Sequence, residues 1–112
     1  FRPLNFEPTF QKFAGELCGG IQQHVIDRAI YRPLRTGYAI LLAARRLWPE
    51  DFAWRQPPYE YELERPAIDI LAGNSSIRKK IEQDAPLQKI EESWLFDLGR
   101  FKKVRERYLL YE

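Results

Sequence analysis

The side chains best suited to chemistry in this sequence are concentrated between Gly15 and Asp27. Read with a period of two from residue 16 to residue 26, this stretch has one mostly apolar face and one small, polar face. The polar face is formed by Cys18, Gly20, Gln22, His24 and Ile26. A half-buried strand usually presents solvating residues on its open side, so we expect this unusual face to bind a ligand. The alternative is that its glycines permit close packing and that Gln22 and His24 bond to neighbouring backbone groups.

A thiol–imidazole pair is the first chemistry to test, because Cys18 and His24 share that face. Six residues of strand separate them by ~20 Å, which places the two side chains far outside hydrogen-bond reach. A local metal site is excluded as well, because the chain has a single cysteine and a single histidine and they lie too far apart to bind the same ion. We therefore expect neither a cysteine nucleophile nor a bound metal ion.

Carboxylates could carry acid–base chemistry, and three of them alternate along one expected strand as Glu60, Glu62 and Glu64. Spaced at ~6.6 Å opposite aromatic residues, they are more typical of a solvated strand face than of a catalytic pair. The sequence also lacks a glycine-rich phosphate loop, a serine elbow and a dinucleotide fingerprint. We therefore expect no catalytic residue and no cofactor in this segment.

A second group of side chains is better suited to holding a polar ligand than to reacting with it. The group consists of Gln22, His24, Arg35, Tyr59 and Tyr61. The glutamine and the histidine supply donors and acceptors, the arginine supplies a fork for a carboxylate, and the flat tyrosine rings suit a sugar. The alternatives are core packing for the two tyrosines and a structural ion pair for Arg35.

The elements that position these residues follow an α+β order. The hydrophobic pattern predicts an edge strand over residues 2–8, the strand over 16–26, a central helix from Pro33 to Trp48 and extended chain over 52–64. Two short helices follow, the first starting at Pro66 and the second turning Ile77 and Ile81 inward. A long helix is expected after Asp84 and Pro86, with Asp84 as its N-cap. Its apolar stripe consists of Leu87, Ile90, Trp94, Leu98, Phe101 and Val104, and the apolar tail 108–111 is expected to pack. The sequence therefore predicts a small mixed or antiparallel sheet packed by a central helix and a long C-terminal helix.

Size and charge restrict the class of protein. The chain has 112 residues, which suits one domain with one core. Its net charge of +2 comes from 18 basic and 16 acidic residues that are interspersed, so we expect no nucleic-acid partner. No apolar run approaches the ~20 residues of a membrane span, and no signal peptide is visible. Because the chain begins with Phe1, we expect it to be a segment of a longer protein.

Several motifs appear in an order that resembles a known bacterial family. They are Phe6–Phe10, Gly15–Gly20 followed by His24-Val25, Arg35–Tyr38, Pro58–Tyr61, Ile68–Gly73 and the ending Tyr108–Tyr111. Together they resemble the C-terminal domain of the NamZ-type exo-β-N-acetylmuramidases, long described as a domain of unknown function. The resemblance extends over essentially the whole chain.

The resemblance implies a full protein with a Rossmann-like N-terminal domain. A cleft between that domain and this one would remove terminal N-acetylmuramic acid from peptidoglycan fragments. The catalytic glutamate would belong to the N-terminal domain, so residues 1–112 would form a single C-terminal domain that is inactive alone. This domain would form one wall of the cleft, and its partners would be that N-terminal domain and a muropeptide or muramic-acid-terminated saccharide. Arg35 then suits the lactyl carboxylate of muramic acid.

Two other functions remain open from the sequence. The segment could be a non-catalytic interaction or stabilising module, in which case the face carrying Cys18 and His24 would be covered by the central helix. It could also be a stand-alone carbohydrate-binding module, which would require an exposed aromatic platform. Secreted and periplasmic locations of the bacterial parent protein are both compatible with the sequence.

Overall fold

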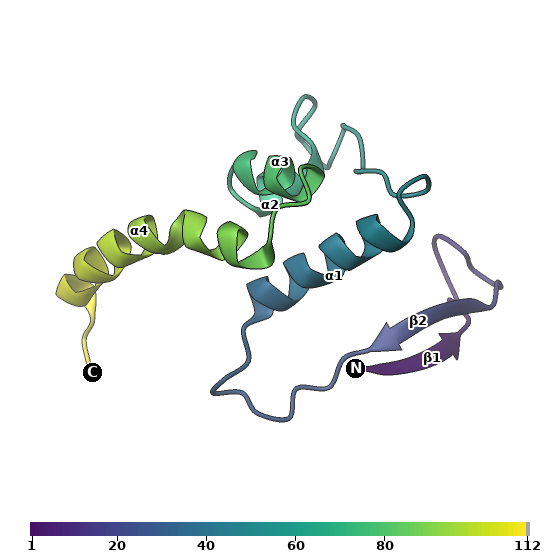
Figure 1. The fold of residues 1–112 in the computed structure, drawn as a ribbon, viewed down its shortest axis with the longest axis horizontal. Helices are drawn as coiled ribbons and strands as arrows, with labels where there is room; N and C mark the ends of the chain where they lie inside the picture. The colour runs from purple at the N-terminus through teal and green to yellow at the C-terminus, as the bar shows by residue number, and fades with distance from the viewer. Residues whose placement is uncertain (112) are drawn as a thin grey trace. The chain divides into compact units, whose positions relative to one another are not determined.

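The computed structural model describes residues 1–111, which divide into two compact units, Phe1–Arg32 and the segment from Pro33 onward. The first unit contains two strands, and the second contains the helices (Figure 1). This order confirms the predicted α+β class. The sheet is antiparallel and has the two strands β1 and β2.

The first unit is a β-hairpin. Strand β1 (Arg2–Phe6) pairs with β2 (Cys18–Gln22) in a register that places Arg2 opposite Gln22 and Phe6 opposite Cys18. The ring of Phe6 lies over β2 so closely that a Cβ atom at Gly20 would come within 2.7 Å of it. A side chain at this position would therefore require the Phe6 ring to move away from the strand.

The predicted strand over residues 16–26 is too long, because β2 ends at Gln22. The reason is the partner: β1 offers backbone groups only from Arg2 to Phe6, so residues beyond Gln22 have no strand to pair with in this hairpin. His24 therefore lies outside the strand rather than on its polar face. Phe10 and Phe13, large apolar residues of the kind that a core usually buries, are exposed in the loop between the strands.

The second unit is built from α1 (Pro33–Leu47), α2 (Ala67–Leu71), α3 (Ser76–Glu82) and α4 (Leu87–Arg105), followed by the 3-10 turn η1 (Glu106–Tyr108). Three of these helices begin at or directly after a proline, where the missing N–H is tolerated. Gly73 follows α2 with a φ of +77°, the left-handed conformation that commonly ends a helix. The helices predicted after Pro33, Pro66 and Pro86 are thus confirmed.

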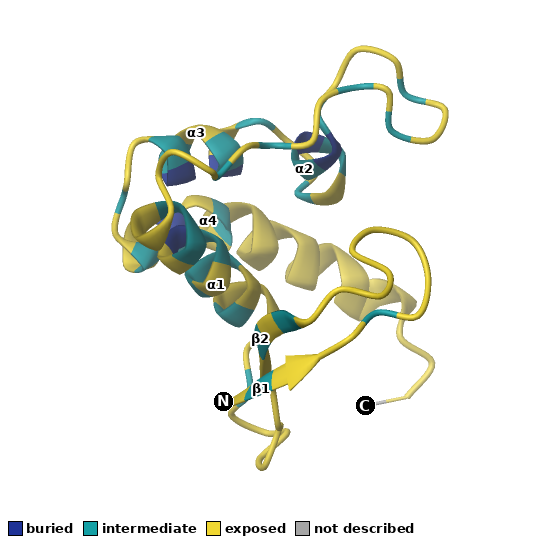
Figure 2. Cartoon of the chain, turned by 90° about the vertical axis from the view of Figure 1, so that its right-hand side faces the viewer, coloured by how far each residue is buried: buried dark blue, intermediate teal, exposed yellow. Residues whose placement is uncertain are grey.

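Helices α1, α3 and α4 meet around a small apolar core. Its buried members are Leu42, Ile77, Ile81 and Ile90. Tyr38, Trp54 and Trp94 pack against this cluster and remain partly exposed. Figure 2 shows buried residues on α3 and on the facing part of α4, whereas the C-terminal half of α4 is exposed. The predicted inward faces of α3 and of the first turns of α4 are therefore confirmed.

Three local predictions for the second unit are wrong. Residues 52–64 form no strand and contain only an isolated bridge between Tyr59 and Glu62, because the pair Pro57-Pro58 cannot donate to a ladder. Asp84 does not cap α4; it accepts a hydrogen bond from Arg46 Nε at 2.6 Å. The tail 108–111 is exposed rather than packed, since the core ends well before the last turns of α4.

Candidate functional site

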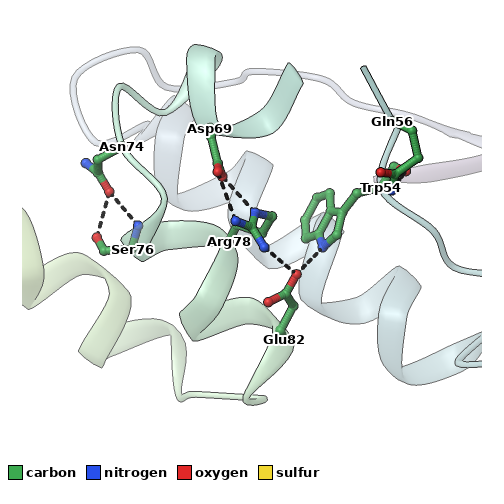
Figure 3. Close-up of polar contacts among 7 residues, drawn as sticks. All are labelled: Trp54, Gln56, Asp69, Asn74, Ser76, Arg78 and Glu82. Atoms are coloured by element: carbon green, nitrogen blue, oxygen red, sulfur yellow. Dashed lines mark hydrogen bonds and ion pairs between the residues drawn. The ribbon is translucent and has the colours of Figure 1, made fainter. Parts of the chain in front are cut away.

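A buried carboxylate organises one side of the helical unit. Asp69 on α2 is 9% exposed and accepts two hydrogen bonds from the guanidinium of Arg78 on α3, at 2.9 and 3.0 Å. Arg78 also donates to Glu82, and the indole N–H of Trp54 donates to the same Glu82 oxygen, each at 3.0 Å (Figure 3). These bonds raise the pKa of Arg78 and hold it charged. The network joins α2, α3 and the loop after α1 into one frame.

Helices α1 and α4 are joined by an ion pair and by two aromatic rings. Arg35, in the first turn of α1, pairs with Glu91 on α4. One turn further along each helix, the rings of Tyr38 and Trp94 lie 5.8 Å apart at an angle of 50°. Burial raises the pKa of the Tyr38 hydroxyl, which therefore stays protonated at neutral pH.

These two rings line a cavity of about 170 Å³, which we call the Tyr38/Trp94 groove. Its apolar lining comes from the two rings and three aliphatic residues, Leu34, Ala72 and Ile77. Its polar lining consists of Asn74, Ser76, Ser93 and Asp97. The groove thus combines aromatic faces with an amide, two hydroxyls and a carboxylate, a composition typical of sites for small polar ligands.

Hydrogen bonds hold the polar lining of the groove in place. The carbonyl oxygen of Asn74 accepts from the backbone N–H of Ser76 at 2.9 Å and from its hydroxyl at 2.6 Å, so the loop before α3 is ordered (Figure 3). The hydroxyl of Ser93 donates to the carbonyl of Ile90 at 2.7 Å. Both serine oxygens keep lone pairs, and the Asn74 amide keeps its N–H₂ donors, for a ligand.

The predicted binding residues of the first unit lie at the end of the hairpin. Gln22 is the last residue of β2, and His24 follows two residues later; both are exposed. Between them, Gln23 donates a hydrogen bond to the hydroxyl of Tyr31. This bond holds the chain after the strand against the connection that leads out of the hairpin.

The predicted binding residues of the second unit have different surroundings. The Arg35 side chain is 44% exposed despite its pairing with Glu91, and the residue before it lines the Tyr38/Trp94 groove. Tyr59 is partly buried beneath the guanidinium of Arg55, 5.3 Å from the ring centre. Tyr61 is 99% exposed. Within each unit, no described hydrogen bond or ring contact joins any two of the five predicted residues.

Glu62 stabilises the tight turn that carries the two tyrosines. Its carboxylate accepts from the backbone N–H groups of Glu64 and Arg65 at 3.0 and 3.2 Å, and from Arg65 Nε at 2.7 Å. These bonds lower its pKa from 4.5 to about 2. Lys89 similarly lowers the pKa of Glu92. A general acid requires the opposite shift, so both carboxylates have structural roles.

Two further features, a metal site and a membrane-spanning helix, are not found among the described residues. Residues 1–111 contain no group of three or more potential ligands arranged to hold a metal ion. Among the same residues, no helix combines the length and the hydropathy needed to cross a bilayer.

Comparison with known proteins places the chain in a family. The family model described as "Exo-beta-N-acetylmuramidase NamZ, C-terminal" matches residues 1–111. The chain belongs to this family. It is also 38% identical over 111 residues to the peptidoglycan beta-N-acetylmuramidase NamZ of Bacillus subtilis strain 168. The aligned region covers 99% of this chain and 25% of the relative. The chain thus spans about a quarter of the length of that curated relative. No solved structure matches it significantly.

Sequence reasoning missed the two best-defined arrangements in this NamZ C-terminal domain. Asp69 lies in one of the motifs that carry the resemblance, yet a single acid in an apolar run does not reveal its partner. Arg78 and Glu82 have the i,i+4 spacing of a helical ion pair, which could have identified half of the network. Trp94 belongs to the apolar stripe predicted for the long helix and Tyr38 to the motif Arg35–Tyr38, and only the packing of α1 on α4 makes them neighbours.

Proposed function

We propose that this chain is the C-terminal, non-catalytic domain of a peptidoglycan exo-β-N-acetylmuramidase. In this proposal it forms one wall of a substrate cleft, and a Rossmann-like N-terminal domain of the same protein forms the other. The observation that carries the proposal is the family match over residues 1–111, together with a relative named as a peptidoglycan β-N-acetylmuramidase that is about four times longer.

The chemistry of the described acids supports a non-catalytic role. Glycoside hydrolysis commonly needs one carboxyl group with a raised pKa beside a second carboxylate. Here the clearly shifted carboxyl groups, Glu62 and Glu92, have lowered pKa values, and Asp69 and Glu82 are both engaged by Arg78. A carboxylate held by an arginine is a poor proton donor. The acid–base residues are therefore proposed to come from the remainder of the parent protein.

We further propose that Gln22, His24, Arg35, Tyr59 and Tyr61 contact a muramic-acid-terminated saccharide. Their exposure is compatible with this role in four cases, and Tyr59 is partly exposed. Arg35 would exchange its pairing with Glu91 for the lactyl carboxylate of muramic acid, since a guanidinium fork fits either carboxylate. Tyr61, which is free of the core, would offer its ring face to the sugar.

One observation favours a second function, that of a docking module. The C-terminal half of α4 exposes Leu98, Phe101 and Val104 at 39%, 59% and 53%, and their i,i+3 spacing places them along one side of the helix. A row of exposed apolar residues on one helix is typical of a surface that another domain covers. In this alternative the domain stabilises the catalytic domain and does not bind the saccharide.

The test uses the full parent protein with a muramic-acid-terminated disaccharide as substrate. We expect Arg35→Gln and His24→Ala to raise KM roughly tenfold with little change in kcat, because they remove uniform binding contacts. Arg100→Gln, an exposed arginine on α4, serves as the matched control for Arg35→Gln. The 112-residue chain alone should release no N-acetylmuramic acid.

Three results would count against the proposal. Unchanged KM values for both variants, with a loss of activity only when apolar residues of α4 are replaced, would leave the docking module as the function. Release of N-acetylmuramic acid by the 112-residue chain alone would refute the non-catalytic role. A parent protein without muramidase activity would refute the assignment as a whole.

A further inference from the structure

We propose that the Tyr38/Trp94 groove is a subsite for an uncharged N-acetylhexosamine, the sugar that adjoins muramic acid in a peptidoglycan strand. This inference rests on the proposed function and assigns that function a second sugar position. It adds residues outside the five proposed above, because the groove is lined by α1, α4, the first turn of α3 and the residues between α2 and α3.

The size and the shape of the groove suit one sugar ring. Its volume is about 170 Å³, and the rings of Tyr38 and Trp94, which contact each other at an angle of 50° with their centres 5.8 Å apart, both border it. A pyranose can lay its apolar C–H face on one ring while its edge faces the other. Ala72 and Ile77, which are apolar lining residues, can contact the methyl of an acetyl group.

The polar lining matches the hydroxyl and amide groups of such a sugar. Asp97 can accept hydrogen bonds from hydroxyl groups, which are charge-assisted and therefore strong. The Asn74 amide offers N–H donors to the acetyl carbonyl, because its own carbonyl is already bonded to Ser76. Ser93 donates to the backbone, so its oxygen acts as an acceptor toward the ligand.

Charge distinguishes the N-acetylhexosamine from the adjoining muramic acid of the peptidoglycan strand. Asp97 is the one ionisable group lining the groove, apart from the neutral Tyr38 hydroxyl. A lactyl carboxylate placed here would be repelled by Asp97, whereas an uncharged N-acetylhexosamine would not. Arg35, directly after the groove residue Leu34, lies in the same first turn of α1 and suits the anionic sugar instead. Arg35 would thus bind the charged sugar, and the Tyr38/Trp94 groove would bind the uncharged sugar next to it.

The three tryptophans of the chain provide a direct assay. Each indole N–H gives a separate NMR signal, and Trp→Phe variants assign the signals. Trp48 lies beyond α1, Trp54 is bonded to Glu82, and Trp94 lines the groove. On titration of the 112-residue chain with N-acetylglucosamine, we expect a saturable shift of the Trp94 signal at millimolar concentrations, with smaller shifts of the other two.

Variants of the groove carboxylate test the role of charge. Asp97→Asn should weaken binding of N-acetylglucosamine about tenfold. N-acetylmuramic acid should bind the groove of the unaltered chain more weakly than N-acetylglucosamine does, and Asp97→Asn should narrow that difference. Asp51→Asn, an identical change at an exposed position after α1, is the matched control and should alter neither affinity. Trp94→Phe keeps an aromatic ring but removes the reporting indole, so its binding is followed by the backbone amide signals of the groove and should weaken about three- to tenfold.

Failure of this inference is distinguishable from failure of the proposed function. No saturable shift of the Trp94 signal, or equal shifts of all three indoles, overturns the subsite. So does tighter binding of N-acetylmuramic acid than of N-acetylglucosamine in the groove, since Asp97 would then not select against charge. The activity of the parent protein is measured separately, and its loss or presence bears on the proposed function rather than on this groove.

Discussion

Ile90 connects the groove to the core, and its replacement offers the sharpest test of the helical unit. The residue is fully buried on α4, one turn before Trp94. Ile90→Ala removes three carbons from the side chain, which costs about 2.4 kcal/mol of transfer free energy at ~0.8 kcal/mol for each carbon. Incomplete collapse of the cavity adds to this, so we expect a total loss of about 3 to 4 kcal/mol.

That loss is large for a core of this size. The cluster has the four buried residues Leu42, Ile77, Ile81 and Ile90, and cores of small domains rarely supply more than ~3–5 kcal/mol. We therefore expect Ile90→Ala to leave the helical unit largely unfolded at 37 °C. Ile90→Val, which keeps the branched shape, should cost only about 1 kcal/mol.

The assay is urea unfolding of the 112-residue chain, followed by circular dichroism and by tryptophan fluorescence. Leu71→Ala, at a position on α2 that is 73% exposed, is the control and should change the free energy of unfolding by less than about 0.5 kcal/mol. A loss below about 1 kcal/mol for Ile90→Ala, or equal losses for both variants, would refute the assignment of Ile90 to the core.

Two further predictions concern the polar contacts. Because hydrogen bonds from the Glu64 and Arg65 backbone and the Arg65 side chain lower the pKa of Glu62 from 4.5 to about 2, the ionised carboxylate stabilises the folded state above pH 4.5, and that contribution is lost as the pH falls toward 2. Glu62→Gln should therefore lower the melting temperature at pH 6 and much less at pH 2; a difference that does not shrink between these values would contradict the mechanism. Asp69→Ala should lower the melting temperature by roughly 5–10 °C, since it removes the buried partner of Arg78. The double variant Asp69→Ala/Arg78→Met should lose less than the sum of the single variants, and strict additivity would show that the pair is not coupled.

The helices of this chain could be predicted because their signals are local. Pro33 and Pro86 mark where α1 and α4 begin, Gly73 marks the end of α2, and the apolar spacing of Ile77 and Ile81 identifies the inward face of α3. These signals act within one or two turns of backbone, where steric restriction and hydrogen bonding decide the conformation. The resemblance to the NamZ C-terminal family was likewise carried by short motifs, and the family match confirms it.

The extent of the extended segments could not be predicted in the same way. The strand predicted to continue past Gln22 stops there because β1 supplies no further partner, which places His24 outside the ladder. The extended pattern near Tyr59 folds into a turn held by Glu62. In both cases the alternation of residue types was present, but a strand also needs a neighbour to bond with.

The sequence by itself determined the class of the fold, the start and stop of the main helices and the family to which the chain belongs. Only the tertiary structure decided which side chains meet: Asp69 with Arg78, Arg35 with Glu91, and Tyr38 with Trp94 across the groove. The physical reason is one of range. Backbone propensity acts over a few residues, whereas these contacts join residues 9 to 56 positions apart and depend on how apolar faces pack around Ile81 and Ile90.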